Sequence, residues 1–291
     1  MADHDDTWDR AVESSVPTSR APDARMLRRR SEDPTLGDGE KPPTSAGWGP
    51  TPTLTDRREL QVPAYVLLEP GAPAGSPAAR VAEGLEALGR PVERLSPEHG
   101  PRTAPTATNS PLVVHVGDVD PVRGPEDVDV YRSGATVSYA VPAGAESARV
   151  QALVARADVV TVAADDLARL HPGEEAASTV RRWLATGPAV VVVTGADGAT
   201  ATNTVGTSAE VRGDHGADPG AFVAGVLDAL WSGGLLGVAA REDLRTLVAG
   251  TLQELLDNAA ASAEVARSTG RPATREELTE ARGVPRLGPP V

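Results

Sequence analysis

Residues 189–194 read Ala-Val-Val-Val-Val-Thr, a run that places apolar side chains on both faces of an extended backbone. A strand of this kind has to be covered on both sides, which is typical of a parallel sheet between two layers of helices. Similar short apolar runs occur at 64–69, 112–116, 135–139 and 159–162. Stretches with helical periodicity alternate with these runs, at 77–88, 145–156, 165–170 and 175–185. The alternation predicts a doubly wound α/β domain with a mostly parallel sheet.

The chain on either side of these runs gives weaker signals. We interpret residues 91–110 as loop-like, and residues 199–205 and 209–212 as a hairpin or edge strands. Three helices are expected near 219–231, 241–256 and 257–267, before an end rich in proline and glycine. The folded domain is therefore expected to span residues 62–285, followed by a flexible C-terminus at 286–291.

Residues 1–60 differ from the rest of the chain in composition. They are rich in proline and charge and show no sustained apolar period of either kind. Such a segment cannot bury enough apolar surface to offset the entropy of ordering it, so we expect a disordered tail. The triplet Arg28-Arg29-Arg30 within it is interpreted as a solvated charge run, with a docking or anion-binding patch as the alternative.

The composition excludes several classes of protein and partner. The 291 residues contain no cysteine, which excludes disulfides, thiolate zinc sites and cysteine nucleophiles. The formal net charge of −13 argues against a nucleic-acid partner. No apolar run is long enough to cross a membrane and the N-terminal residues are polar, so neither a membrane span nor a secretory signal is expected. A cytoplasmic location is the default expectation.

Several stretches carry a second kind of information, because their order and spacing follow a known pattern. They are a Gly75-Ser76-Pro77-Ala78 turn opening the helical stretch to 88, the strands at 135–139 and 157–162, the strand and glycine turn at 190–199, the segment 214–231, and residues 271–278 near the end. Together they resemble the ribokinase-like (PfkB-type) carbohydrate kinases, and among them the fructokinase-like branch, over roughly residues 62–282.

The resemblance implies an ATP-dependent kinase that places phosphate on the hydroxyl of a fructose-like sugar, with Mg²⁺ bridging the phosphates. It assigns sugar contacts to Gly75 and Ser76 and an indirect magnesium contact to Asp166. It assigns nucleotide contacts to Thr194, Gly195, Gly198, Gly216, Ala217 and Gly220. The segment between residues 89 and 112 is far shorter than the family's, so the small lid is expected to be reduced or absent. A protein partner or a homodimer stays open.

The catalytic position departs from the family pattern. The family places its catalytic aspartate in a Gly-Ala-Gly-Asp turn, and a register fixed on Phe222 puts Gly220 at that place. The nearest acid is Asp218, which precedes Pro219, a residue without an N–H. Asp218 is either only the cap of the following helix or, in a remodelled turn, the catalytic base.

Other departures point the same way. The family's sugar-contacting asparagine is missing near Ala79, and of its Asn-x-x-Glu motif only the acid survives, as Asp166. Impaired catalysis is therefore expected, and the alternative is a non-catalytic pseudokinase that acts as a nucleotide-sensing or protein-binding module. We expect weak, magnesium-dependent binding of ATP or ADP to outlast catalysis. The glycines at 195 and 198 either let backbone approach the nucleotide or only make a hairpin turn.

Overall fold

The computed structural model describes residues 64–67, 75–95, 111–117, 124–216 and 218–283. All of these residues lie within Arg57–Val291, the second of the two units into which the chain divides. The tail expected at 1–60 and the flexible C-terminus expected at 286–291 lie outside the described residues.

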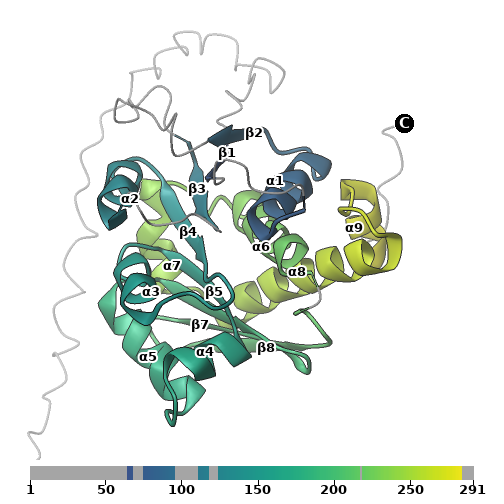
Figure 1. Ribbon diagram of the computed structural model, residues 1–291. Coiled ribbons are helices and arrows are strands. Elements are labelled where there is room, and N and C mark those ends of the chain that lie inside the picture. Colours follow the sequence, from purple (N-terminus) through teal and green to yellow (C-terminus); the bar gives the residue numbers. More distant parts are fainter. Residues whose placement is uncertain (1–63, 68–74, 96–110, 118–123, 217, 284–291) are drawn as a thin grey trace, which may run out of the picture. The chain divides into compact units, whose positions relative to one another are not determined.

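An eight-stranded sheet organises this second unit, in the order β2-β1-β3-β4-β5-β6-β7-β8 (Figure 1). Neighbouring strands are parallel from β2 to β6, and β7 and β8 continue the sheet in antiparallel pairing. The strands are β1 Ala64–Leu67, β2 Val92–Leu95, β3 Val113–Val116, β4 Thr136–Ala140, β5 Val159–Ala163, β6 Val190–Thr194, β7 Gly198–Asn203 and β8 Ser208–Arg212. The path from β1 outward to β2 and back to β3 reverses beside β1, and ligands of such sheets bind at the carboxyl ends near a reversal.

Helices cover both faces of the sheet, which confirms the doubly wound α/β prediction. One face carries α1 (Pro77–Ala87), α6 (Pro219–Ser232) and α8 (Ala249–Thr269). The other carries α2 (Gly124–Arg132), α3 (Ser147–Val154), α4 (Ala164–Leu170) and α5 (Ala176–Thr186). The valine run explains this arrangement, because Val190 and Val192 enter the first apolar cluster and Val191 enters the second. Figure 1 shows α6 and α8 side by side, and their contact is the largest between helices.

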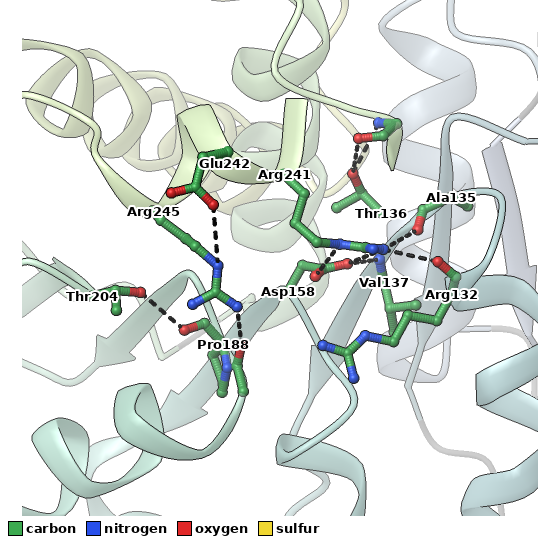
Figure 2. A network of polar contacts seen from close by, with 12 residues as sticks. Arg132, Ala135, Thr136, Val137, Asp158, Pro188, Thr204, Arg241, Glu242 and Arg245 are labelled. Carbon is green, nitrogen blue, oxygen red and sulfur yellow. Dashed lines mark hydrogen bonds and ion pairs between the residues drawn. The ribbon is translucent and has the colours of Figure 1, made fainter. Parts of the chain in front are cut away.

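The boundary expected between residues 256 and 257 is wrong. The chain instead forms a short 3₁₀ turn (Val238–Ala240) and α7 (Arg241–Arg245), which is capped at Thr246. It then forms α8, unbroken from Ala249 to Thr269. Arg241 anchors α7 to Asp158, the residue before β5 (Figure 2). The break therefore lies where tertiary contacts fix α7, which periodicity along the chain does not reveal.

Three elements do not follow from the sequence patterns. Residues 91–110 were expected to be loop-like, but Val92–Leu95 form the edge strand β2, whose central residues Glu93 and Arg94 are exposed and give no apolar alternation. Helix α2 has few apolar residues. Helix α9 (Arg275–Ala281) lies in the end described only as rich in proline and glycine, and it begins at a capping box between Thr274 and Glu277.

The described residues add nothing above this sheet that resembles a lid. Every strand among them belongs to the eight-stranded sheet, and most of the segment between residues 89 and 112, where the reduced lid is expected, lies outside the described residues. None of the helices in the described ranges combines the length and apolar character needed to cross a membrane.

Candidate functional site

The candidate site lies at the carboxyl edge of the sheet, where several elements end or begin. Strand β6 ends there at Thr194. Strand β7 is antiparallel to both of its neighbours, so β8 runs in the same direction as β6 and also ends at this edge, at Arg212. Helix α1 follows β1 and helix α6 follows β8, so both helices start at this edge. The topology therefore places at this edge the residues singled out at 75–76, 194–198, 216, 218 and 220.

Asp218 is fully engaged by other groups of the protein. It caps α6, with Oδ1 accepting a hydrogen bond from the Ala221 N–H at 3.0 Å. Its other oxygen, Oδ2, lies 2.8 Å from Nη2 of Arg80 on α1. The Asp218 side chain is only 11% exposed. Both carboxylate oxygens are thus already hydrogen-bonded, one to helix α6 and one to helix α1.

Gly220 sits directly beneath the first turn of α1. A Cβ at this position would lie 2.4 Å from the Cβ of Arg80 and 2.8 Å from the carbonyl oxygen of Pro77. Real Cβ atoms do not approach other atoms so closely, so an aspartate at position 220 would require α1 to move. The contact between α1 and α6 fills the space in front of the position where the family pattern has its acid.

The two residues assigned to sugar binding shape the start of α1. Gly75 has φ of +90°, a conformation that glycine adopts without strain. The Ser76 Oγ accepts a hydrogen bond from the Ala79 N–H at 3.3 Å and caps the helix. Both residues therefore have a local structural role at this edge.

A cleft of about 870 Å³ lies beside the glycine turn that follows β6. Thr194 lines it, is 3% exposed, and has no hydrogen-bond partner for its hydroxyl among the described residues. The charged residues that line the cleft are Asp165, Asp197, Glu210, Asp214 and Arg212. A second hollow of about 680 Å³ adjoins it between α8 and residues 211–215.

The glycines of this turn differ in how much room a side chain would have at each position. The Gly195 N–H donates to the Gly198 carbonyl at 2.8 Å, and a Cβ on Gly195 would make only ordinary contacts at 3.7 Å. A Cβ on Gly198 would lie 2.3 Å from the Val211 carbonyl oxygen. The hairpin between β7 and β8 thus requires Gly198, whereas a Cβ at position 195 could be accommodated. The Gly216 N–H donates to Asp214 Oδ1 at 3.1 Å, and Ala217 lies outside the described residues.

Asp166 does not line the cleft. Its Oδ1 accepts hydrogen bonds from the Gly144 N–H at 3.1 Å and from Arg169 Nη2 at 3.2 Å. The neighbouring Asp165 lines the cleft instead. Among the described residues no group of three or more acidic or histidine side chains is arranged to hold a metal ion.

Sequence analysis missed the four carboxylates of the cleft, although a signal for three of them exists. Asp165, Asp197 and Asp214 each follow a strand end by two or three residues, after β5, β6 and β8. The carboxyl ends of parallel strands meet at one edge, so acids at these offsets are expected near one another. Glu210 lies within β8 and has no such signal.

Two histidines near the site are buried packing residues. Burial lowers the pKa of His115 to about 4, and its Nδ1 lies 3.1 Å from the Ser138 Oγ on the neighbouring strand. His215 is 6% exposed, packs its ring on Phe222 and places Nε2 3.2 Å from the Arg212 carbonyl oxygen. The ring contacts of the two histidines are thus to Ser138, to Phe222 and to the Arg212 backbone, and no hydrogen bond to a carboxylate is made by either ring among the described residues.

Comparisons with known proteins identify the fold. No family model matches the chain, and no curated protein matches it in sequence. A fructokinase from Xylella fastidiosa is similar in structure, with 17% identity, a TM-score of 0.58 and coverage of 76% of this chain and 98% of that one. The same enzyme with bound ATP matches at 18% identity and TM-score 0.55, covering 71% and 89%. A PfkB protein from Polaromonas sp. JS666 matches at 18% identity and TM-score 0.52, covering 75% and 99%.

These neighbours define the class of architecture. The eight-stranded, mostly parallel sheet with helices on both faces is the ribokinase-like α/β fold of PfkB-type carbohydrate kinases. The fold predicted from the sequence is thereby confirmed, and function has to be argued from the site.

Proposed function

We propose that this protein is a non-catalytic descendant of a PfkB-type sugar kinase, a pseudokinase that keeps a nucleoside-sized cleft but does not transfer phosphate. The observation that carries the proposal is Gly220. It stands where the resemblance puts the catalytic aspartate, and a Cβ there would lie 2.4 Å from the Cβ of Arg80. The position therefore lacks the acid and also lacks the room for one.

Asp218 is a poor replacement for the missing base. A general base must reach the proton that it removes with a free oxygen. Both oxygens of Asp218 are engaged, at 3.0 Å by the Ala221 N–H and at 2.8 Å by Arg80. The sugar hydroxyl would have to displace Arg80, which lies over the same helix start.

The residues present fit only part of Mg-ATP. The cleft and the unpartnered Thr194 hydroxyl suit a ligand with hydroxyl and amine groups. The donors that a triphosphate needs are used elsewhere or missing, because Pro219 has no N–H and the Ala221 N–H is bound to Asp218. Weak binding of ATP or ADP that depends on Mg²⁺, in the range of tens of micromolar to millimolar, is part of the proposal.

A coupled ADP-release assay with a panel of hexoses that includes fructose tests the proposal. We expect no turnover above background from the full chain at millimolar Mg-ATP. The matched variant is Asp218→Asn, because asparagine caps a helix as well as aspartate does and keeps the shape of the side chain. Turnover that is present in the wild type and lost in Asp218→Asn would show that the turn is remodelled around an active base, and the proposal would be wrong.

A further inference from the structure

We infer that the cleft selects a nucleoside or a nucleoside monophosphate and discriminates against free di- and triphosphates. The inference rests on the proposed function, since it names the ligand class of the same cleft. In a kinase the triphosphate supplies much of the interaction with the protein, so ATP is expected to bind more tightly than adenosine. The inference is the opposite order of affinity.

The charge of the cleft is the first argument. Four carboxylates line it, from Asp165, Asp197, Glu210 and Asp214, and Arg212 is the one basic residue that the described part of the chain contributes. All five of these residues are exposed, so the repulsion between a phosphate and the carboxylates acts through solvent and is weakened by salt. One guanidinium can match one phosphate, but the second and third phosphates of ATP would face an excess of carboxylates.

The start of helix α6 is the second argument. A free helix N-terminus attracts anions through its unpaired N–H groups and its dipole. Here Pro219 removes one donor, and the Ala221 N–H is bound to Asp218 at 3.0 Å. The carboxylate of Asp218 itself already stands at the positive end of the helix dipole, and Arg80 neutralises it at 2.8 Å. The helix therefore has little left to offer a phosphate.

The glycine turn after β6 leads to the same conclusion. The Gly195 N–H is bound to the Gly198 carbonyl, and the Gly213 N–H is bound to the Asp197 carbonyl at 3.2 Å. The Gly216 N–H is bound to the Asp214 carboxylate. These three N–H groups are thus used within the protein and are not available to an anion.

What the cleft does offer suits the uncharged part of a nucleotide. Thr194 is 3% exposed and lines the cleft, and no hydrogen bond joins its hydroxyl to another described residue, so a ligand hydroxyl or amine could bond to it. Carboxylates accept hydrogen bonds from ribose hydroxyls and from an exocyclic amine. About 870 Å³ is within the range of small-molecule sites.

Calorimetric titration of the full chain with adenosine, AMP, ADP and ATP in excess EDTA tests the inference. We expect adenosine and AMP to bind about tenfold or more tightly than ATP, with ADP between them, and we expect Mg²⁺ or higher salt to narrow the difference. Glu210→Gln should reduce the preference for adenosine over ATP. Asp243→Asn removes the same charge from the exposed surface of α7, outside the cleft lining, and should leave the preference unchanged.

The outcomes separate this inference from the proposed function. Affinity in EDTA that rises from adenosine to ATP would overturn the inference and leave the cleft as a nucleotide site. A preference unchanged by Glu210→Gln but altered by Asp243→Asn would also overturn it, because the discrimination would then come from overall charge. No binding of any of the four ligands would overturn both the inference and the proposed cleft function.

Discussion

The charged residues at the amino edge of the sheet are buried and paired, whereas those at the carboxyl edge are more exposed. At the amino edge, Arg241 lies 2.7 Å from Asp158, whose side chain is 1% exposed, and also donates to the carbonyls of Arg132 and Ala135 (Figure 2). The Val137 N–H donates to the same aspartate. At the carboxyl edge, the Asp218–Arg80 pair is more exposed, and the carboxylates around the cleft have few protein partners.

This difference indicates at which edge residues can be replaced without loss of the fold. At the amino edge the charged side chains hydrogen-bond to backbone groups as well as to one another. Arg245 is a further example, since it donates to the Gly187 carbonyl at 3.1 Å. Loss of Asp158 or Arg241 leaves a largely buried charge without its partner. The carboxyl edge holds exposed charges whose removal costs little stability, so catalytic residues could be lost there while the fold was kept.

Asp158→Ala should have the largest effect on stability. It leaves Arg241 without its partner and the Val137 N–H without its acceptor, and breaking a buried pair of this kind costs about 3–5 kcal/mol. Urea unfolding followed by circular dichroism measures the change. The control is Asp129→Ala, whose pair with Arg156 is 51% exposed at the aspartate and should contribute less than about 1 kcal/mol. Equal effects of the two variants would contradict the contrast between buried and exposed pairs.

Acid should lower the stability of the protein through His115, which lies on β3. Burial lowers the pKa of His115 to about 4, below its ordinary value near 6.5, so the unfolded chain binds a proton that the folded chain does not. The stability that neutral His115 allows is present above about pH 6.5 and is lost as the pH falls towards 4, by up to roughly 3 kcal/mol.

The His115→Gln variant isolates this contribution, because glutamine does not titrate and can still hydrogen-bond to Ser138. Urea unfolding across pH 4–7 should show a smaller slope for the variant than for the wild type. A wild-type stability that falls no faster than that of His115→Gln would show that His115 is not kept neutral by burial.

Gly220→Ala tests the contact between α1 and α6 directly. The added Cβ would meet Arg80 and Pro77, and an extra methyl group in a packed contact costs about 1–3 kcal/mol. Gly250→Ala is the matched control, since a Cβ there has no neighbour within 4 Å and alanine favours the helix. Thermal unfolding should separate the two, with Gly220→Ala melting lower and Gly250→Ala melting at or above the wild type.

The smallest effect is expected at Asp218. Asp218→Ala removes a helix cap and should destabilise the protein by about 1 kcal/mol, whereas Asp218→Asn keeps the cap and should cost less. The comparison of both variants in urea unfolding checks this. A loss with Asp218→Asn as large as that with Asp218→Ala would indicate that the pair with Arg80, rather than the cap, carries the stability.

Much of the fold follows from local patterns in the sequence. The valine run at 190–194 identifies a strand covered on both sides, and the hairpin that follows is visible in the alternation of residues 199–212. Strand β2 and the break before α8 do not follow, because an exposed edge strand has no apolar alternation and α7 is fixed by Asp158, which lies far away in the sequence.

The site is harder to derive from the sequence, for a physical reason. Sequence patterns assign Gly198 to nucleotide binding, but only the structure reveals that the Val211 carbonyl leaves no room for a Cβ at that position. Asp166 was assigned to magnesium from its motif, yet its partners Gly144 and Arg169 hold it outside the cleft lining while Asp165 lines it. Which way neighbouring side chains face depends on contacts between distant segments.

Phosphorus NMR of ATP and Mg²⁺ with the hexose panel, at protein concentrations high enough to detect single turnovers, tests the central claim most directly. The packing of Gly220 under Arg80 predicts that the γ-phosphate signal persists and that no sugar-phosphate signal forms. A sugar-phosphate signal that grows with the wild-type protein and is absent with Asp218→Asn would contradict the claim that this edge has lost phosphoryl transfer.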